Sequence, residues 1–302
     1  MKVSVIIPTY NGEHYLSQLM KILQQQTVTF ELIIIDSSST DNTRNIVAPY
    51  ADKVITIPQN KFDHGGTRQK ALQEASGEIL IFLTQDALPD SEDTFAKILS
   101  IFDHAQVSAA YGRQLAYDTT NIFGKHLRAF NYPGEAYIRE LADKEKYGIK
   151  TAFLSDSFAA YRKSMILEVG GFKSGLIFGE DTHIASKLLF AGYSIAYVAE
   201  ARVYHSHSYT WIQEFQRYFD MGVFHIKEGW ILDIFGKAEG EGLTYLKSEW
   251  AYLLKHYAYA QIPAFFIRNG LKYIGYKMGK RYKLFPKKIV RKCSMHTSWW
   301  DT

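Results

Sequence analysis

The first third of the chain alternates short, unbroken apolar runs with stretches whose apolar residues recur at helical spacing. The runs of strand length are Val3–Ile7, Leu32–Ile35, Val54–Ile57 and Ile79–Leu83. The stretches of helical spacing are Tyr15–Gln26, Thr40–Ala48 and Gly66–Ala75. Strand–helix alternation of this kind predicts an α/β fold with a mostly parallel sheet and helices on both faces.

Polar residues stand just beyond three of these predicted strands. Thr9, Asp36 and Asp86 follow the first, second and fourth runs. In open α/β sheets, ligands bind outside the carboxyl ends of the strands. These three residues are therefore the first candidates for a binding site.

The pattern changes from Tyr111 onward. Aromatic and polar residues mix there without clean alternation, and we expect loops and short strands that wall a pocket. Thr182–Ala191 is predicted to be a helix and Tyr193–Val203 a strand, and from Trp211 the spacing is mainly helical. We therefore expect an α/β domain over residues 1–210 and a helical C-terminal region over residues 211–302.

Composition is that of a folded globular chain, since the 302 residues are 47% apolar and 22% charged. The single cysteine, Cys293, excludes an internal disulfide and fits a reducing cytoplasm. No stretch approaches the roughly 18 uninterrupted apolar residues of a membrane-spanning helix, and the start lacks the pattern of a signal peptide. We expect a cytoplasmic protein.

The net charge of +4 conceals an asymmetry. Between Trp250 and Trp300 the chain carries eleven Lys or Arg residues and no Asp or Glu. The first 249 residues carry 24 basic and 30 acidic residues, a net charge of −6. An acidic body with a basic, aromatic-rich tail predicts two surfaces with different partners.

Several blocks of sequence, in a fixed order, resemble family 2 glycosyltransferases. They are Val3–Asn11, Glu31–Asp36, Ser39–Thr43, Gly77–Asp86, Gly170–Phe172 and Gly179–Asp181, within roughly residues 1 to 207. Each block alone is weak, but their order and spacing together are specific. The resemblance implies a GT-A type fold, a nucleotide-activated sugar as donor, inversion at the anomeric carbon and a divalent metal.

Glu180 and Asp181 resemble the acidic pair of this family, whose Asp is the catalytic base. A carboxylate can take the proton of the acceptor hydroxyl as that hydroxyl attacks the anomeric carbon. Adjacent carboxylates raise each other's pKa, which helps a base to work near neutrality. The structural alternative is that both residues begin a helix and interact with its dipole.

Asp86 is predicted to be the principal ligand of Mn²⁺ or Mg²⁺. A divalent cation neutralises the charge that grows on a diphosphate leaving group. The family usually has Asp-x-Asp at this place, whereas this chain has Thr84-Gln85-Asp86. A second ligand is expected from His205 or His207, just after a predicted strand. The resemblance favours His205, the alternative being a structural hydrogen-bond donor.

The remaining predicted contacts concern the nucleotide sugar, and they are Thr9, Asp36, Asp41, His64, Arg68 and Gln85. Asp36 is expected to accept a hydrogen bond from a pyrimidine ring nitrogen or, alternatively, to cap the next helix. Asp41 serves either the ligand or that helix start. Arg68 is expected to contact the diphosphate or Asp86, with a surface salt bridge as the alternative. For His64 we expect either a contact with donor phosphate or a role in tying down a glycine-rich turn.

Further stretches resemble bacterial rhamnosyltransferases within the family. They are Asn60–Arg68, Leu83–Ala87, Tyr111–Gln114 and Arg217–Gly222. The resemblance implies dTDP-L-rhamnose as donor and transfer onto a saccharide of a bacterial surface polysaccharide. Two alternatives stay open. One is a glycosyltransferase that uses a UDP-hexose, and the other is a weakly catalytic nucleotide-sugar-binding membrane scaffold, suggested by the incomplete Asp-x-Asp.

The basic tail predicts an amphipathic helix. Its apolar residues fall on one narrow arc at helical spacing, namely Ile267, Leu271, Ile274, Met278 and Phe285. Basic residues occupy the other directions, which is typical of a helix on a membrane surface. We expect peripheral attachment to the inner face of the plasma membrane and a lipid-linked saccharide acceptor. The alternatives are a helix packed on the catalytic domain and a homo-oligomer contact, and no nucleic-acid partner is expected.

Overall fold

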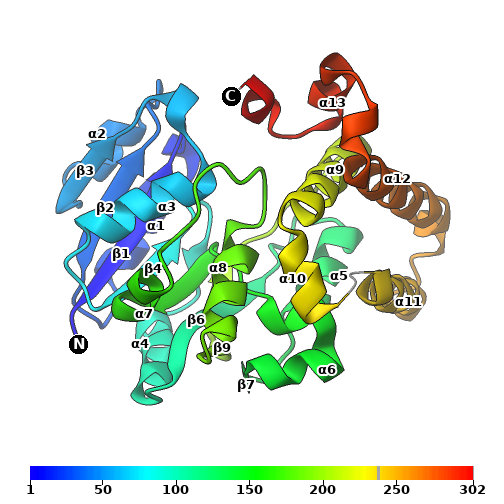
Figure 1. Ribbon diagram of the computed structural model, residues 1–302. Helices are drawn as coiled ribbons and strands as arrows, with labels where there is room; N and C mark the ends of the chain where they lie inside the picture. Colours follow the sequence, from blue (N-terminus) through cyan, green and yellow to red (C-terminus); the bar gives the residue numbers. More distant parts are fainter. Residues whose placement is uncertain (237–238, 302) are drawn as a thin grey trace.

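The computed structural model describes residues 1–236 and 239–301 (Figure 1). Over these residues one nine-stranded sheet forms the centre of the molecule, in the order β3-β2-β1-β4-β8-β6-β9-β5 with β7 paired to β9. The strands are β1 (Val3–Thr9), β2 (Glu31–Asp36), β3 (Lys53–Thr56), β4 (Ile79–Leu83), β5 (Leu88–Pro89), β6 (Val107–Leu115), β7 (Tyr137–Arg139), β8 (Phe158–Arg162) and β9 (Ser194–Tyr204).

The sheet has a parallel half and a mixed half. Strands β3, β2, β1 and β4 pair in parallel, as the strand–helix alternation predicts. Strand β8 is antiparallel to both β4 and β6, while β9 is parallel to β6 and antiparallel to β5 and β7. The α/β prediction is confirmed, and the parallel character holds for the half that the regular alternation covered.

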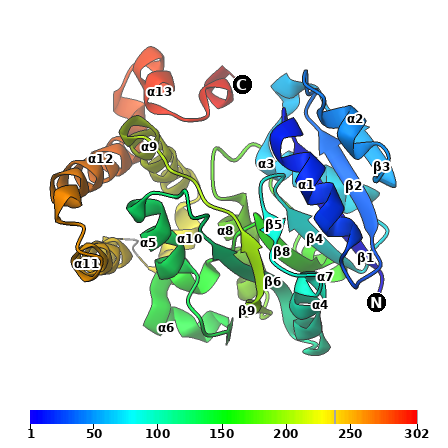
Figure 2. The ribbon, with the colours of Figure 1, turned by 180° about the vertical axis from the view of Figure 1, so that it is seen from behind.

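Helices cover both faces of the sheet (Figure 1, Figure 2). They are α1 (Glu13–Gln24), α2 (Thr43–Val47), α3 (His64–Glu74), α4 (Thr94–Leu99), α5 (Ile122–Asn131), α6 (Lys144–Tyr147), α7 (Lys163–Glu168), α8 (Glu180–Phe190), α9 (Trp211–Lys227), α10 (Gly229–Phe235), α11 (Glu239–Lys255), α12 (Ile262–Lys280) and α13 (Lys287–Cys293). Short 3-10 turns lie at Gln59–Lys61, Ser100–Asp103, Leu141–Asp143, Gly148–Ala152, Tyr259–Gln261, Tyr282–Leu284 and Thr297–Asp301.

Two hydrophobic clusters fill the two sides of the sheet. Because successive side chains of a strand point to opposite faces, Val5 packs with α1 and α4 on one side, and Ile6 with α3 and α8 on the other. Figure 2 shows α1 and α4 on the first side, and Figure 1 shows α3 and α8 on the second. Phe219 and Val223 of α9 belong to the second cluster. The first C-terminal helix therefore shares the core of the sheet.

Helix α12 crosses α9 at short range because glycines face the contact. A Cβ atom added to Gly275 would lie 2.4 Å from the carbonyl oxygen of Phe215, and one added to Gly279 would lie 2.0 Å from that of Phe219. On the other helix, a Cβ on Gly222 would lie 2.4 Å from the carbonyl oxygen of a residue in α12. Glycines lower helix propensity, but at these positions they permit the crossing.

The outer surface of α12 differs from the arc predicted from the sequence. Its buried side includes Arg268, while Ile267 and Ile274 are 45% and 49% exposed. Met278 and Phe285 pack against the core instead. The predicted arc is therefore wrong for Phe285, which lies beyond the end of α12, and the arc is not a wholly exposed surface, because packing covers Met278. No helix within the described residues is long and apolar enough to cross a membrane.

Candidate active site

Three potential metal ligands meet beyond the ends of β4 and β9. Oδ2 of Asp86 lies 3.5 Å from Nε2 of His205 and 3.6 Å from Nε2 of His207. One ligand atom from each of the three residues lies within 4.8 Å of the others. The end of β9 pairs with β5 directly after Asp86, which brings the two segments together. The cluster thus contains both histidines that the sequence offered as alternatives.

The surroundings of this cluster suit a cation. Burial opposes ionisation of Asp86. At the low pH where this carboxyl titrates both histidines are protonated, and the hydrogen bond from His205 and the charges of the two rings hold the pKa of Asp86 well below its usual range. Burial lowers the pKa of both histidines, that of His207 to about 4. One carboxylate and two neutral imidazoles at neutral pH are the protonation states that metal binding requires. The two nitrogen donors favour a transition-metal ion over Mg²⁺, whose ligands are oxygens.

Gln114 of β6 orients one of these ligands. Its Oε1 lies 2.9 Å from Nδ1 of His205, and its Nε2 donates to Oγ of Ser155 at 2.9 Å. Because Oε1 is an acceptor, Nδ1 carries the proton and Nε2 is left free on the side of Asp86. A contact of this kind fixes the tautomer and direction of a metal-binding histidine. Gln114 lies in the Tyr111–Gln114 stretch, for which the sequence suggested no role.

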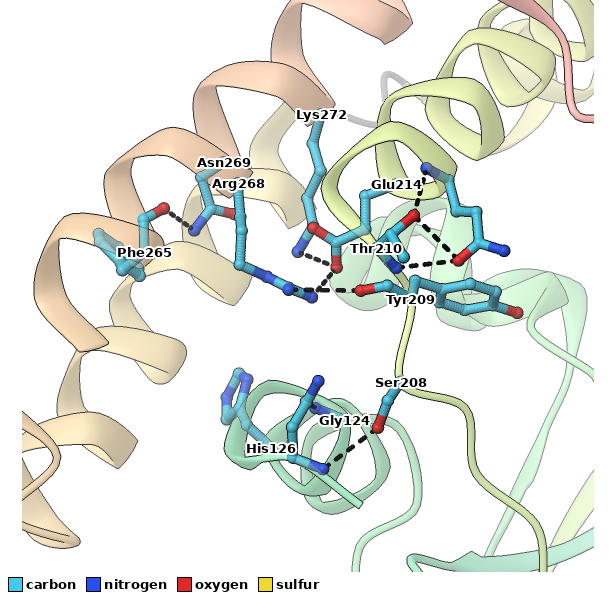
Figure 3. Close-up of polar contacts among 12 residues, drawn as sticks. Gly124, His126, Ser208, Tyr209, Thr210, Glu214, Phe265, Arg268, Asn269 and Lys272 are labelled. Atoms are coloured by element: carbon cyan, nitrogen blue, oxygen red, sulfur yellow. Dashed lines mark hydrogen bonds and ion pairs between the residues drawn. The ribbon is translucent and has the colours of Figure 1, made fainter. Parts of the chain in front are cut away.

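The segment Ser208–Thr210, directly after His207, is held by α5 and by the start of α9 (Figure 3). Oγ of Ser208 accepts a hydrogen bond from the backbone N–H of Asn121 at the start of α5. Thr210 begins α9 with a capping box, in which its hydroxyl and the side chain of Gln213 each accept from the other's backbone N–H. Capping contacts satisfy amide groups that a helix start leaves free. The segment therefore has a defined path between β9 and α9.

The C-terminal helix α12 braces the same segment (Figure 3). Arg268 donates through Nη1 to the carbonyl oxygen of Tyr209 at 3.5 Å, and its Nη2 pairs with Glu214 of α9. Nζ of Lys272 lies 3.8 Å from the same carboxylate. These charged side chains are all nearly buried. The polar side of α12 thus supports the path of the metal-ligand segment.

A second charged cluster lies at the start of α8. Nε of Arg68 is 2.6 Å from Oδ2 of Asp156, and its Nη1 is 3.0 Å from Oε1 of Glu180. Asp156 directly precedes β8, whose Phe158 pairs with Leu83 of β4, so it lies at the same edge of the sheet as the metal-ligand cluster. Arg68 is 5% exposed, so the predicted surface salt bridge is wrong. Its ion pairs are with Asp156 and Glu180, so the predicted contact with Asp86 is wrong as well. Its contact with a diphosphate stays a prediction.

The carboxyl groups of this cluster differ in acidity. Burial, and after it the charges of Glu180 and Asp156, raise the pKa of Asp181. Burial also raises the pKa of Asp156. At Glu180 burial acts in the same direction, but the charge of Arg68 together with the smaller effects of other neighbours outweighs it and lowers the pKa of Glu180. Among these carboxyl groups, Asp181 therefore has the most strongly raised pKa. Its side chain stays partly accessible, with Oδ1 accepting from the N–H of Thr182 at 2.7 Å.

Thr9 and Asp36 lie buried together at the ends of β1 and β2. Oγ1 of Thr9 donates to Oδ1 of Asp36 at 3.2 Å, and Ser39 donates to the same carboxylate through its hydroxyl at 2.5 Å and its N–H at 3.0 Å. Asp36 does not cap the next helix, whose N-cap is Asn42. Asp36 has no exposed surface. The base contact stays a prediction.

Asp41 and Gln85 hold the loops after β1 and β2. The carboxylate of Asp41 accepts from the N–H of Glu13 at 3.1 Å and from that of Thr43 at 3.0 Å. The side-chain amide of Gln85 makes two hydrogen bonds with the backbone of Tyr10, at 3.0 and 3.1 Å. Both residues thus have structural contacts, and their contact with a nucleotide sugar stays a prediction. Gln85 is the middle residue of the Thr84-Gln85-Asp86 motif, and Thr84 stands where the family usually has its first Asp.

The glycine-rich turn before α3 is tied down by Asp63. Its Oδ1 accepts from the N–H of Gly66 at 2.8 Å and from that of Gly175 at 3.2 Å, and its Oδ2 accepts from Oγ of Ser174 at 3.0 Å. Asp63, rather than His64, therefore ties down the glycine-rich turn. The imidazole of His64 is left available for another contact.

Two arginines that the sequence analysis did not select flank the metal-ligand cluster. Arg128 of α5 and Arg217 of α9 both act electrostatically on His205 and His207. The guanidinium of Arg217 lies over an aromatic ring 5.6 Å away on Tyr209. Within residues 1–236 and 239–301, neither arginine forms an ion pair, and Nε of Arg128 has no hydrogen-bond partner. Cations without anionic partners beside a candidate metal centre suit a diphosphate.

The sequence has full-length relatives of known class. The profile of glycosyl transferase family 2 matches residues 4–170. The chain is 45% identical over 301 residues to the O-antigen chain rhamnosyltransferase WbaN of Salmonella anatum, which covers 99% of this chain and 95% of that one. It is 41% identical over 304 residues to the O-antigen chain rhamnosyltransferase RfbN of Salmonella typhimurium, which covers 100% of this chain and 96% of that one.

Solved structures share the fold. The mannosyltransferase PcManGT from Pyrobaculum calidifontis, in complex with GDP-Man and Mn²⁺, superposes with a TM-score of 0.60 at 18% identity, covering 99% of this chain and 85% of that one. TarS residues 1–349 of S. aureus, in complex with UDP-GlcNAc, give 0.60 at 19% identity, with 98% and 84% coverage. At such low identity these likenesses show the GT-A type fold and nothing finer.

Proposed function

The chain belongs to glycosyl transferase family 2, and we propose that it transfers rhamnose from dTDP-L-rhamnose to a saccharide acceptor with inversion at the anomeric carbon. The observation that carries the proposal is the meeting of two unlike clusters at one edge of the sheet. Asp86 with two neutral imidazoles forms one cluster, and Asp181 with its neighbouring carboxylates forms the other. The first suits the leaving diphosphate and the second suits the attacking hydroxyl.

Asp181 is the proposed base. As the acceptor oxygen forms its bond to the anomeric carbon, the bond from that carbon to the diphosphate oxygen breaks, and the hydroxyl proton passes to the carboxylate of Asp181. The raised pKa of this carboxyl makes it basic enough to accept the proton near neutrality. Glu180 keeps Arg68 beside it through the ion pair at 3.0 Å. A single displacement from the face opposite the leaving group inverts the configuration.

The leaving group is served by the other side of the site. Asp86, His205 and His207 would hold the metal ion, and the buried hydrogen bond that Nδ1 of His205 donates to Oε1 of Gln114 fixes one of them for that role. Bound there, a divalent ion such as Mn²⁺ supplies Lewis-acid neutralisation of the diphosphate. Arg128 and Arg217 supply further positive charge from α5 and α9. The departing dTDP keeps the electron pair of the broken bond.

The choice of donor rests on relatives. WbaN and RfbN are named as rhamnosyltransferases and match this chain over nearly its full length. By that likeness we assign transfer of rhamnose in the synthesis of a surface polysaccharide. The intact Glu180–Asp181 pair argues against the weakly catalytic scaffold. A UDP-hexose remains the competing donor, and a donor panel distinguishes the two.

The acceptor is proposed to be linked to a lipid at a membrane surface. Large apolar side chains are exposed on one side of α12, namely Phe266, Ile267, Tyr273 and Ile274. Beyond them the exposed residues Lys283, Lys287 and Lys288 lie in and before α13. Apolar anchors next to basic side chains suit an anionic bilayer. A cytoplasmic site at the inner face of the plasma membrane would bring acceptor and donor together.

A donor panel tests the function. Purified protein is given dTDP-rhamnose, dTDP-glucose, UDP-glucose and GDP-mannose with a lipid-linked saccharide acceptor, and the released nucleoside diphosphate is measured. We expect turnover with dTDP-rhamnose that stops when the metal is chelated and returns with Mn²⁺. Turnover of a UDP sugar alone would remove the rhamnose assignment and keep the enzyme class.

Vesicle binding tests the membrane surface separately. Because α12 packs into the structure, point variants are preferable to truncation. Ile267→Ser with Ile274→Ser should reduce co-sedimentation with vesicles rich in phosphatidylglycerol while activity on a short soluble acceptor is retained. Phe190→Ser, on a residue 66% exposed at the end of α8, is the matched control. A change in oligomeric state in place of vesicle binding would assign this surface to a homo-oligomer.

A further inference from the structure

The end of the chain returns from α13 to His64, at the start of α3. Figure 1 and Figure 2 show the C-terminal segment turning back toward the first half of the molecule. The fully buried carboxylate of Asp220 in α9 accepts from the N–H of Met295 at 2.9 Å and from that of His296 at 3.4 Å. Further along, Nε1 of Trp299 donates to the carbonyl oxygen of Gly175 at 2.9 Å. Two anchors from different elements thus fix the segment.

This segment brings a second imidazole beside that of His64. The ring centroids of His64 and His296 lie 5.5 Å apart with the planes at 86°. Asp63 takes over the contacts of the turn, so the His64 ring has no structural hydrogen bond. In the part of the chain that the structure describes, no side-chain hydrogen bond joins either ring to the protein. Both residues are only partly buried, so their ring nitrogens are within reach of a ligand.

The charges around the two rings select the kind of ligand. Burial lowers the pKa of His64 against the opposing charge of Glu180, and burial with His64 and Arg217 lowers the pKa of His296 to about 4. Both imidazoles are therefore neutral at pH 7. A neutral imidazole offers one donor and one acceptor, which matches hydroxyl groups, since these also donate and accept. A diphosphate needs cations, and the nearby arginines supply those.

The position of the pair selects the part of the substrate. His64 begins α3, which follows β3 in the half of the sheet that carries the predicted nucleotide contacts. The charge of Glu180, the neighbour of the proposed base, acts on both rings. In a donor bound as proposed, the anomeric carbon lies between the nucleotide and the base. The two imidazoles, which lie between the nucleotide half and Glu180, would therefore be next to the sugar ring of the donor.

We propose that His64 and His296 together bind hydroxyl groups of the donor's sugar ring, so that the C-terminal segment completes the donor site. The proposal rests on the proposed function for the identity of the sugar. It assigns to the last residues of the chain a part in donor recognition, separate from any contact with a membrane. His296 is then a substrate-binding residue, and Asp220 is a positioning residue that acts through it.

Binding by calorimetry tests the proposal without requiring turnover. The dissociation constants of dTDP and dTDP-rhamnose are measured with Mn²⁺ for the wild type, His296→Leu, His296→Gln and Ser298→Ala. Leu keeps the bulk of the ring without its nitrogens, Gln restores an uncharged donor and acceptor, and Ser298 is exposed two residues away. We expect His296→Leu to weaken dTDP-rhamnose about five- to tenfold, the loss of one hydrogen bond, and to leave dTDP unchanged. Gln should restore most of the affinity, and Ser298→Ala should match the wild type.

Two results would overturn the proposal. Unchanged affinity of His296→Leu for dTDP-rhamnose would remove His296 from the sugar site. An equal loss for dTDP and dTDP-rhamnose would mean that the segment acts on the nucleotide or on the fold, which thermal unfolding of the same variants separates. If the donor panel gives another sugar nucleotide, the rhamnose assignment fails, and the same comparison with that donor and its free nucleotide still decides the role of His296.

Discussion

Two aspartates of one site, Asp86 and Asp181, have opposite acid–base character. Asp86 faces two imidazoles, and in their protonated form the hydrogen bond and the charges outweigh the effect of burial and lower the pKa of Asp86. Asp181 faces two carboxylates, and burial together with their charges raises its pKa. The same side chain is therefore a permanent anion in one place and a proton acceptor in the other. Neighbours, rather than residue type, divide the two roles.

The supports of the two sides also differ. The metal-ligand segment is braced by α12, through Arg268 at the carbonyl oxygen of Tyr209. The start of α8 is held by Arg68, which comes from the N-terminal half and pairs with Glu180 and Asp156. The metal side thus depends on the C-terminal helices, and the start of α8 depends on the nucleotide half. Substitutions can therefore change one side of the site without changing the other.

The largest effect is expected at the base. Asp181→Asn keeps the shape of the side chain but cannot accept a proton, so turnover should fall about 10²- to 10⁴-fold while the dissociation constant of the donor stays the same. The measurement is kcat at saturating donor and acceptor, with donor binding by calorimetry. Near wild-type turnover would move the base to another residue.

A smaller but still large effect is expected at the brace of the metal side. Arg268→Gln leaves Glu214 nearly buried with Lys272 as its remaining cationic partner, and breaking a buried pair in this way costs about 3 to 5 kcal/mol of folding free energy. Denaturant unfolding measures the loss. The exposed Arg281→Gln on the same part of the chain is the control, with a change of less than about 0.5 kcal/mol expected. Equal effects of the two variants would contradict a bracing role.

The third effect concerns the metal alone. Gln114→Leu removes the acceptor for Nδ1 of His205 and frees its tautomer, so the affinity for Mn²⁺ should fall about 10- to 100-fold. The readout is the Mn²⁺ concentration that gives half-maximal activity, and kcat at saturating Mn²⁺ should be much less affected. Gln106→Leu, at an exposed position, is the matched control. An unchanged Mn²⁺ requirement would remove His205 from the ligand set.

The smallest effect sharpens the comparison at the base itself. Burial and the charge of Glu180 raise the pKa of Asp181 to about 8, and the base works only when ionised, so kcat/KM should fall as the pH drops through this range. Glu180→Gln removes one of the raising charges, and the acid limb should therefore move to lower pH. A limb that stays in place or moves upward would show that Glu180 does not set the acidity of Asp181.

Much of the fold and part of the site followed from local patterns. The runs Val3–Ile7 and Ile79–Leu83 are strands as predicted, and Asp86 stands at the strand end where a ligand site is expected. Asp156 and Arg128 left no local signal, because each lies where apolar and polar residues mix and takes its place only through tertiary contacts. The polar face of α12 was predicted to be exposed, because a helical wheel does not reveal that Arg268 is buried against α9. His296 was likewise not predicted, because it is far from His64 in the sequence and meets it only in the folded protein.

The most direct test compares how two variants bind dTDP-rhamnose with and without Mn²⁺. The account predicts that Asp86→Asn loses the part of the donor affinity that depends on Mn²⁺, while Asp181→Asn keeps that part and loses turnover. It would be contradicted if Mn²⁺ still strengthened donor binding to Asp86→Asn as in the wild type, or if Asp181→Asn lost the Mn²⁺-dependent affinity instead.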